Sequence, residues 1–145
     1  MPRAGSTMTK SDRRIELEWI SGQRFKAKSD NGLETTLDGN RKDGFSPMDS
    51  LLSSLCACMG IDVVMILEKM RTGFTGLRIS IEGERAEEPP RYFQRVRMHF
   101  EIQGDVPRDK AQRAVDLSLE KYCSVFHSLR KDLDVQTTID ILEAT

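Results

Sequence analysis

The chain has 145 residues, and its 22 Lys and Arg nearly balance its 23 Asp and Glu, so the formal net charge is −1. This length predicts one domain with a core of moderate size. The balanced charge argues against a nucleic acid or an anionic membrane held by bulk electrostatics. No uninterrupted run of eighteen or more apolar residues is present, so no membrane-spanning segment is expected.

The N-terminal segment, residues 1–12, is polar and lacks the apolar stretch of a secretory signal. We expect it to be a flexible tail, followed by a single domain over residues 13–145. The chain contains 3 cysteines, which do not form the pattern of a disulfide framework. The cytoplasm is therefore the expected location.

The region after the tail has the alternation and turn signals of a small antiparallel sheet. Three strands are expected at residues 15–20, 24–28 and 33–37. Turn-forming residues separate them, including the strong hairpin signal Asp30-Asn31-Gly32. A polar loop over residues 40–45 follows.

A long helix is predicted over residues 46–71. Ser46 is a favourable N-cap, Pro47 suits the first helical position, and Asp49 can accept hydrogen bonds from free amides of the first turn. Basic residues in the last turn and Gly73 beyond it mark the end. Its apolar residues cover more than one narrow stripe, so we expect burial on most sides, against a sheet and a second subunit.

The second half of the chain predicts three more strands and two helical segments. The strands are expected at residues 77–82, 96–103 and 135–142. The helical segments are expected at residues 107–122 and 124–129. The order βββ-α-ββ-α-β predicts one α+β domain.

The three cysteines lie at Cys56 and Cys58 in the long helix and at Cys123 near the end of the second helix. A cysteine inside a helix is most often a small buried hydrophobe. Residues two apart on a helix face different sides, so Cys56 and Cys58 do not form a metal knuckle. His99 and His127 are isolated and are expected at the surface or in packing. No metal site is expected.

A pair of distant cysteines offers a different chemistry. If the two helices pack side by side, oxidation of one thiol to a sulfenic acid can be followed by condensation with the second thiol. Sequence spacing alone does not show which thiols meet. No glycine-rich phosphate-binding loop is present, and no nucleotide or other cofactor is expected.

Two motifs resemble those of the OsmC/Ohr family. The first begins at Ser46-Pro47-Met48-Asp49, runs through small residues to Cys58, and continues through residues 61–71. The second is Glu120-Lys121-Tyr122-Cys123-Ser124-Val125. Residues 84–90 and 114–118 add similarity to the YhfA-like branch, and the resemblance covers roughly residues 15 to 142.

The resemblance implies an OsmC-like fold, in which two long helices pack with antiparallel sheets in an intertwined homodimer. It also implies a thiol-dependent peroxidase that reduces organic hydroperoxides, with an apolar pocket between subunits. By position, Cys58 corresponds to the peroxidatic cysteine and Cys123 to the resolving cysteine, whereas Cys56 is left as a packing thiol. The expected partners are a second copy, a small-molecule peroxide and a dithiol reductant, with no nucleic acid and no membrane.

Family peroxidases also carry an acidic residue, usually Glu, that holds an active-site arginine. Asp49 corresponds to the acidic position, where it also serves as a helix cap, and Arg24 and Arg41 are the two candidates for the arginine. A nearby guanidinium stabilises a thiolate and lowers a cysteine pKa from about 8.5.

The shorter Asp49 side chain and the unsettled arginine favour an alternative function. In this alternative the protein is a non-enzymatic member of the fold, either a thiol redox sensor or a small-molecule-binding protein. A purely structural dimer with inert cysteines is the third hypothesis.

Overall fold

The computed structural model describes residue 9 and residues 12–143. The chain divides into two compact units, Met1–Ser50 and Leu51–Thr145. Their boundary falls inside the stretch 13–145, for which the sequence predicts a single domain. The flexible tail expected over residues 1–12 lies almost entirely outside the described residues.

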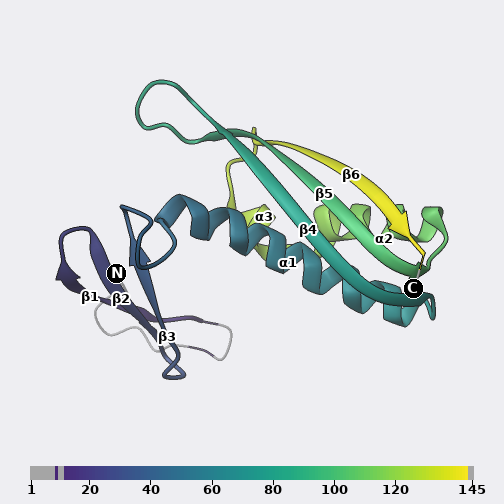
Figure 1. The fold of residues 1–145 in the computed structure, drawn as a ribbon, viewed down its shortest axis with the longest axis horizontal. Helices are drawn as coiled ribbons and strands as arrows, with labels where there is room; N and C mark the ends of the chain where they lie inside the picture. The colour runs from purple at the N-terminus through teal and green to yellow at the C-terminus, as the bar shows by residue number, and fades with distance from the viewer. Residues whose placement is uncertain (1–8, 10–11, 144–145) are drawn as a thin grey trace. The chain divides into compact units, whose positions relative to one another are not determined.

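The N-terminal unit contains an antiparallel sheet of three strands in the order β1-β2-β3 (Figure 1). The strands are β1 (Ile15–Ser21), β2 (Arg24–Ser29) and β3 (Glu34–Asp38). Each boundary lies within one residue of the sequence prediction. Gly22 and Gly32 adopt positive φ angles of 54° and 88° in the two turns, which glycine does without steric cost.

The loop after β3 is built around the buried carboxylate of Asp38. This carboxylate accepts hydrogen bonds from the backbone N–H groups of Asn40, Lys42 and Asp43, at 2.8, 3.2 and 3.0 Å. These bonds hold the pKa of Asp38 below its ordinary value, the bond from Asp43 contributing most. The loop that carries Arg41 therefore has a defined backbone.

The long helix is α1 (Pro47–Lys69), and its first turn is closed by a capping box. The Asp49 N–H donates to the Ser46 hydroxyl at 3.1 Å, and the Ser46 N–H donates to the Asp49 carboxylate at 3.2 Å. At the other end, Arg71 takes a positive φ of 56°, the left-handed position expected of a residue after a helix. Gly73 already belongs to the next strand.

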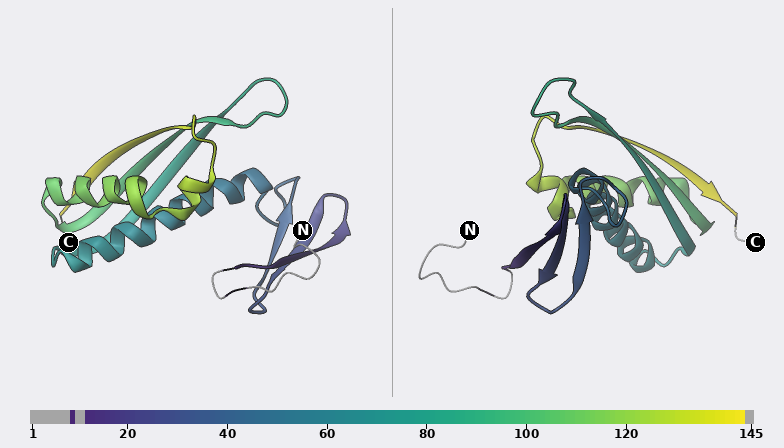
Figure 2. Two further views of the ribbon diagram at one scale, coloured as in Figure 1. Left: turned by 180° about the vertical axis from the view of Figure 1, so that it is seen from behind. Right: turned by 60° about the vertical axis from the view of Figure 1, so that its left-hand side comes forward.

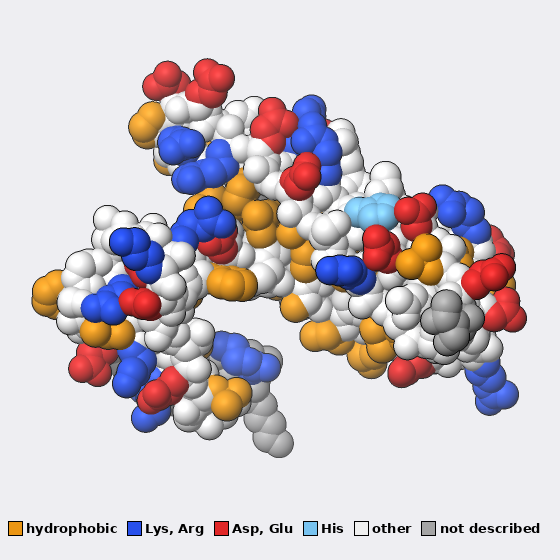
Figure 3. Space-filling view, in the orientation of Figure 1, with side chains coloured by type: hydrophobic (Ala, Val, Ile, Leu, Met, Phe, Trp, Pro, Cys, Tyr) orange, Lys and Arg blue, Asp and Glu red, His pale blue; other side chains and the backbone are white. Residues whose placement is uncertain are grey.

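Only one stripe of α1 is fully buried within the chain. The stripe consists of residues spaced four apart: Leu55, Met59, Val63 and Leu67. Ile61 and Met65 are 60% and 63% exposed, and hydrophobic side chains gather on the surface over this helix (Figure 3). Within a single chain the sheet covers one face of α1. The sequence predicts burial on most sides, against a sheet and a second subunit, and burial of the remaining sides stays a prediction.

The helix α1 is long and apolar enough to cross a membrane by length and composition, with a mean hydropathy of 2.0 over eighteen residues. The criterion of an uninterrupted apolar run missed this because Asp62, Gly60 and three serines interrupt the helix. Core helices of soluble proteins have the same profile, so a single helix of this kind is weak evidence. The absence of a membrane partner stays a prediction.

The C-terminal unit contains a second sheet of three strands in the order β4-β5-β6. The strands are β4 (Gly73–Arg85), β5 (Phe93–Asp105) and β6 (Asp134–Leu142). The hairpin strands β4 and β5 are longer than predicted, because glycines and charges at their ends resemble loop sequence. Pairing between them continues past Gly76 and Gly83.

The strands β5 and β6 pair in parallel, whereas the resemblance implies antiparallel sheets throughout. The reason is the long connection between them, which contains α2 (Arg108–Leu117), the π-helix η1 (Ser118–Tyr122) and α3 (Ser124–Ser128). This connection returns the chain to the end where β5 began, as parallel pairing requires.

The helices cover one face of this sheet (Figure 2). The core between the layers is formed by the buried stripe of α1, alternate residues of β5 and the inner face of α2. The contributions of β5 and α2 are Val96, Met98, Phe100, Ile102, Ala111, Ala114 and Val115. Small alanines on α2 allow close packing, which brings the end of this helix and the following π-helix onto the core.

Candidate active site

Cys58 and Cys123 interact in the C-terminal unit, although 64 intervening residues separate them in the sequence. Cys58 lies half-buried on α1, and Cys123 is fully buried directly after η1. Cys58 is close enough to the Cys123 thiol to contribute to the raised pKa of Cys123. The structure therefore brings together the two cysteines that the resemblance selects.

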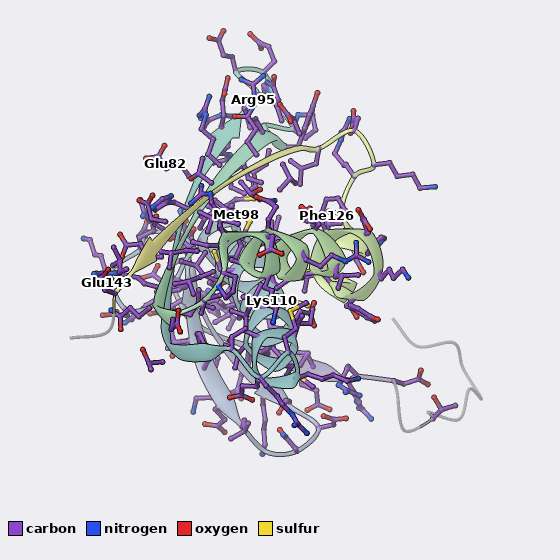
Figure 4. All side chains as sticks on the ribbon, turned by 90° about the vertical axis from the view of Figure 1, so that its right-hand side faces the viewer. Glu82, Arg95, Met98, Lys110, Phe126 and Glu143 are labelled. Atoms are coloured by element: carbon purple, nitrogen blue, oxygen red, sulfur yellow. The ribbon has the colours of Figure 1, made fainter. Side chains whose placement is uncertain are left out.

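A π-helical turn holds the backbone of Cys123. The Cys123 N–H donates to the Ser118 carbonyl, five residues earlier, at 2.8 Å. The Cys123 sulfur in turn accepts a hydrogen bond from the Phe126 N–H at 3.4 Å, so it caps α3. Figure 4 shows Phe126 on this last helical segment and Met98 on the sheet. Single π-turns in proteins frequently mark functional sites.

The Cys123 thiol is held in its protonated form at neutral pH. Burial is the largest cause and raises its pKa, with further contributions from Cys58 and from the charge of Asp62, to about 11. The hydrogen bond from the Phe126 N–H opposes this shift without cancelling it. Cys123 is therefore poor as an attacking thiolate but available as a thiol.

Asp62 and Ser118 are part of this cluster and were not assigned a role from the sequence. The Ser118 hydroxyl, in a fully buried residue, donates to the Asp62 carboxylate at 2.8 Å. Asp62 follows Cys58 by four residues on α1 and so lies on the same face of the helix. A carboxylate in the middle of an apolar helix was the available signal, because such groups need a partner when partly buried.

Asp49 and Arg41 form a second group, in the N-terminal unit. The Arg41 Nε donates to the Asp49 carboxylate at 2.8 Å. Burial would raise the Asp49 pKa, but hydrogen bonds from Ser46 and Arg41 outweigh it and hold the pKa below the ordinary value. Asp49 therefore combines both roles that the sequence left open, as a helix cap and as a partner for an arginine.

Arg24 has a different partner. Its guanidinium donates to Asp43 at 2.6 Å and to the Ser21 hydroxyl. Of the two arginines considered from the sequence, Arg41 is the one on the Asp49 carboxylate. Its side chain is 70% exposed, against 29% for Asp49.

Cys56 is half-buried and packs against the hydrophobic core, where burial raises its pKa. His99 interacts with Thr138 and Asp140 on the sheet, at 2.6 and 3.1 Å. His127 contacts the Leu119 carbonyl at 2.9 Å. Among the described residues, no group of three or more His, Cys, Asp or Glu side chains could hold a metal ion.

The fold is that of a small α+β protein with a long helix and free cysteines. Comparison with known proteins identifies the family. The profile of the family described as "OsmC-like protein" matches residues 39–138. The chain therefore belongs to the OsmC-like family. Among curated relatives, Protein YhfA of Escherichia coli K12 is 38% identical over 130 residues, which cover 88% of this chain and 97% of YhfA.

Solved structures show the same fold. A hypothetical protein from Aquifex aeolicus VF5 is 30% identical, with a TM-score of 0.85, over 93% of this chain and 99% of that chain. An OsmC-like protein from Mycoplasma pneumoniae is 19% identical, with a TM-score of 0.80, over 92% and 99%. An organic hydroperoxide resistance protein OsmC from Legionella pneumophila is 16% identical, with a TM-score of 0.70, over 92% and 99%.

Proposed function

We propose that this protein reduces organic hydroperoxides through a two-cysteine cycle of Cys58 and Cys123. The observation that carries the proposal is the proximity of the two thiols, with Cys58 on α1 raising the pKa of Cys123, which directly follows the π-helical turn. Membership of the OsmC-like family and the likeness to hydroperoxide resistance proteins support a redox or peroxide-related role.

In the first step, Cys58 attacks the terminal oxygen of the hydroperoxide. The O–O bond breaks, Cys58 becomes a sulfenic acid, and the remaining oxygen leaves with a proton as the alcohol. Cys58 suits this role because it is the less buried of the pair, whereas Cys123 is fully buried and strongly protonated. Reactive cysteines combine access with thiolate character.

In the second step, the Cys123 sulfur attacks the sulfenic sulfur of Cys58. The Cys123 S–H bond and the Cys58 S–O bond break, a disulfide forms, and the proton and hydroxide leave as water. A cellular dithiol then reduces the disulfide by thiol–disulfide exchange and is itself oxidised. No electron donor other than this dithiol is needed.

Of the two arginines considered from the sequence, we assign Arg41 to the role of the active-site arginine that the family resemblance implies. Thiolate formation in a half-buried position is favoured by a nearby guanidinium. The support is the ion pair of Arg41 with Asp49, at the acidic position of the family motif. Arg24 is committed to Asp43 instead.

A second function, a slow thiol redox sensor, is favoured by one observation. Asp62 places negative charge near the thiol pair, and Cys123 has a pKa of about 11, so its thiolate is scarce at neutral pH. Such a pair forms a disulfide slowly, which suits a switch better than a catalyst. The two functions differ in turnover.

The peroxidase and the redox sensor can be distinguished by measuring how much cumene hydroperoxide the purified protein consumes in the presence of dithiothreitol. We expect multiple turnovers in the wild type, none in Cys58→Ser, and a single oxidation without turnover in Cys123→Ser. Cys56→Ser is the matched control and should retain turnover. Cumene hydroperoxide should be preferred to hydrogen peroxide, because burial of alkyl carbon contributes about 25 cal/mol per Å². Wild-type protein that forms the disulfide but stops after one equivalent would contradict the peroxidase and support the sensor.

A further inference from the structure

We propose that Asp62 and Ser118 are positioning residues that set Cys123 against Cys58 and control when the disulfide between them forms. The inference rests on the proposed two-cysteine cycle and assigns roles in its second step. Asp62 contributes a negative charge and accepts a hydrogen bond from Ser118. Ser118 thereby links α1, which carries Cys58, to the turn that carries Cys123.

The link consists of two consecutive hydrogen bonds between α1 and Cys123. The Ser118 hydroxyl donates to the Asp62 carboxylate at 2.8 Å, and the Ser118 carbonyl accepts the Cys123 N–H at 2.8 Å. Ser118 is fully buried, so water does not compete for either bond. Asp62 is four residues beyond Cys58 on the same helix. The chain of bonds therefore fixes the Cys123 backbone relative to the helix face that presents Cys58.

The polar link lies in an otherwise apolar region. Ser118 follows the buried Ala114 and Val115 of α2, and the buried residues Met59 and Val63 flank Asp62 along α1. Partial burial of a carboxylate is costly, and a purely packing role would be met by an apolar pair. The polar pair thus fits a positional and electrostatic role better than a contribution to stability.

The charge of Asp62 and the hydrogen-bonded link have opposite effects on the rate of disulfide formation. Cys58 and Asp62 on α1, with the Phe126 N–H on α3, are the groups that act on the Cys123 thiol. A nearby carboxylate disfavours the thiolate, so Cys123 stays a thiol while Cys58 meets the peroxide. Once Cys58 is a sulfenic acid, Cys123 loses its proton as its sulfur attacks. The link speeds this step by orientation, and the charge slows it.

Two substitutions separate these effects because they have opposite signs. Asp62→Asn keeps an oxygen that can accept from Ser118 but removes the charge, so Cys123 should ionise at lower pH. Ser118→Ala keeps the charge but removes the link, so Cys123 should ionise as before but lie in a less defined position. Glu68→Gln, an exposed carboxylate on the same helix, is the matched control.

The first measurement needs no peroxide. In a Cys56→Ser/Cys58→Ser background, ultraviolet absorbance of the Cys123 thiolate is followed against pH. Asp62→Asn should lower the titration midpoint by about half a unit or more, whereas Ser118→Ala and Glu68→Gln should leave it in place.

The second measurement follows disulfide formation after one equivalent of cumene hydroperoxide, with Cys56 and both reactive cysteines intact. At neutral pH, Asp62→Asn should form the disulfide about threefold faster, because a downward shift of half a unit in the midpoint triples the thiolate population. Ser118→Ala should form it about tenfold more slowly through lost orientation, and Ser118→Thr, which keeps the hydroxyl, should restore much of the rate.

Equal slowing by Asp62→Asn and Ser118→Ala, with an unmoved midpoint, would overturn the inference and leave the pair a structural contact only. If Ser118→Ala fails to fold, the sign of the Asp62→Asn shift decides alone. A wild type that ignores peroxide would overturn the proposed function instead. In that case the pH titration would still test the role of Asp62. Disulfide formation would then be followed in dithiothreitol redox buffers instead of after peroxide, and the variants should show the same order of rates.

Discussion

At the residue scale, the pairing of Arg41 with Asp49 distinguishes two arginines that the sequence could not separate. The sequence places Arg24 in the second strand and Arg41 in the loop before α1, and neither lies in a decisive motif. In the structure Arg41 forms an ion pair with Asp49, whereas Arg24 forms one with Asp43. The choice depends on the folded loop around Asp38, which no local pattern in the sequence specifies.

We therefore predict that Arg41→Ala slows the first oxidation of Cys58 by about tenfold or more, because it removes the cation assigned to stabilise charge in this step. The measurement is the rate of sulfenic acid formation in a Cys123→Ser background. Arg24→Ala is the comparison and should have the smaller effect. A large loss in Arg24→Ala beside a near-normal Arg41→Ala would reverse the assignment.

Some residues of the candidate site could be selected from the sequence, and others could not. The resemblance selected Cys58 and Cys123, and the structure places them together. Asp62 and Ser118 were missed as site residues because their partnership spans 56 positions and depends on how η1 meets α1. Their roles follow from tertiary contacts, whereas local rules described the Ser46 and Asp49 cap in advance.

At the element scale, local chemistry predicted which segments form helices and strands but not how far each extends. The first three strands and the start of α1 follow their turn and capping residues closely. The strands β4 and β5 extend well beyond their predicted ends, because cross-strand pairing overrides the poor strand propensity of glycine and charged residues.

The π-turn before Cys123 also lay beyond sequence reasoning. The sequence predicts one helix to Tyr122, whereas the regular helix ends at Leu117 and continues as η1. The turn places the Cys123 N–H on the Ser118 carbonyl, five residues back, instead of four. A change of one residue in hydrogen-bond spacing rotates the chain about the helix axis and so decides where the cysteine points.

At the scale of the whole molecule, several large apolar side chains are exposed on the single chain. Ile61 and Met65 on α1 are exposed, and on β1 so is Trp19, at 63%. Monomeric proteins rarely leave large apolar patches uncovered. A second copy of the chain is the occupant that we propose, in agreement with the homodimer implied by the resemblance.

Light scattering at low micromolar concentration should give about twice the chain mass of 16.5 kDa. Met65→Lys should weaken the dimer, because burial of an unpaired charge at an apolar contact is unfavourable. Glu68→Lys, an exposed change on the same helix, is the control. A stable wild-type monomer would contradict the proposed assembly, and the cytoplasmic location is a separate prediction that this measurement does not address.

The most direct test of the account is peptide mapping of wild-type protein after treatment with one equivalent of organic hydroperoxide, with free thiols blocked before digestion. The account predicts one disulfide, between Cys58 and Cys123, with Cys56 recovered as a blocked thiol. The reason is that Cys58 and Cys123 already lie close together in the reduced protein. A bridge that contains Cys56, or continued peroxide turnover with no Cys58–Cys123 bridge at any time, would contradict the central claim.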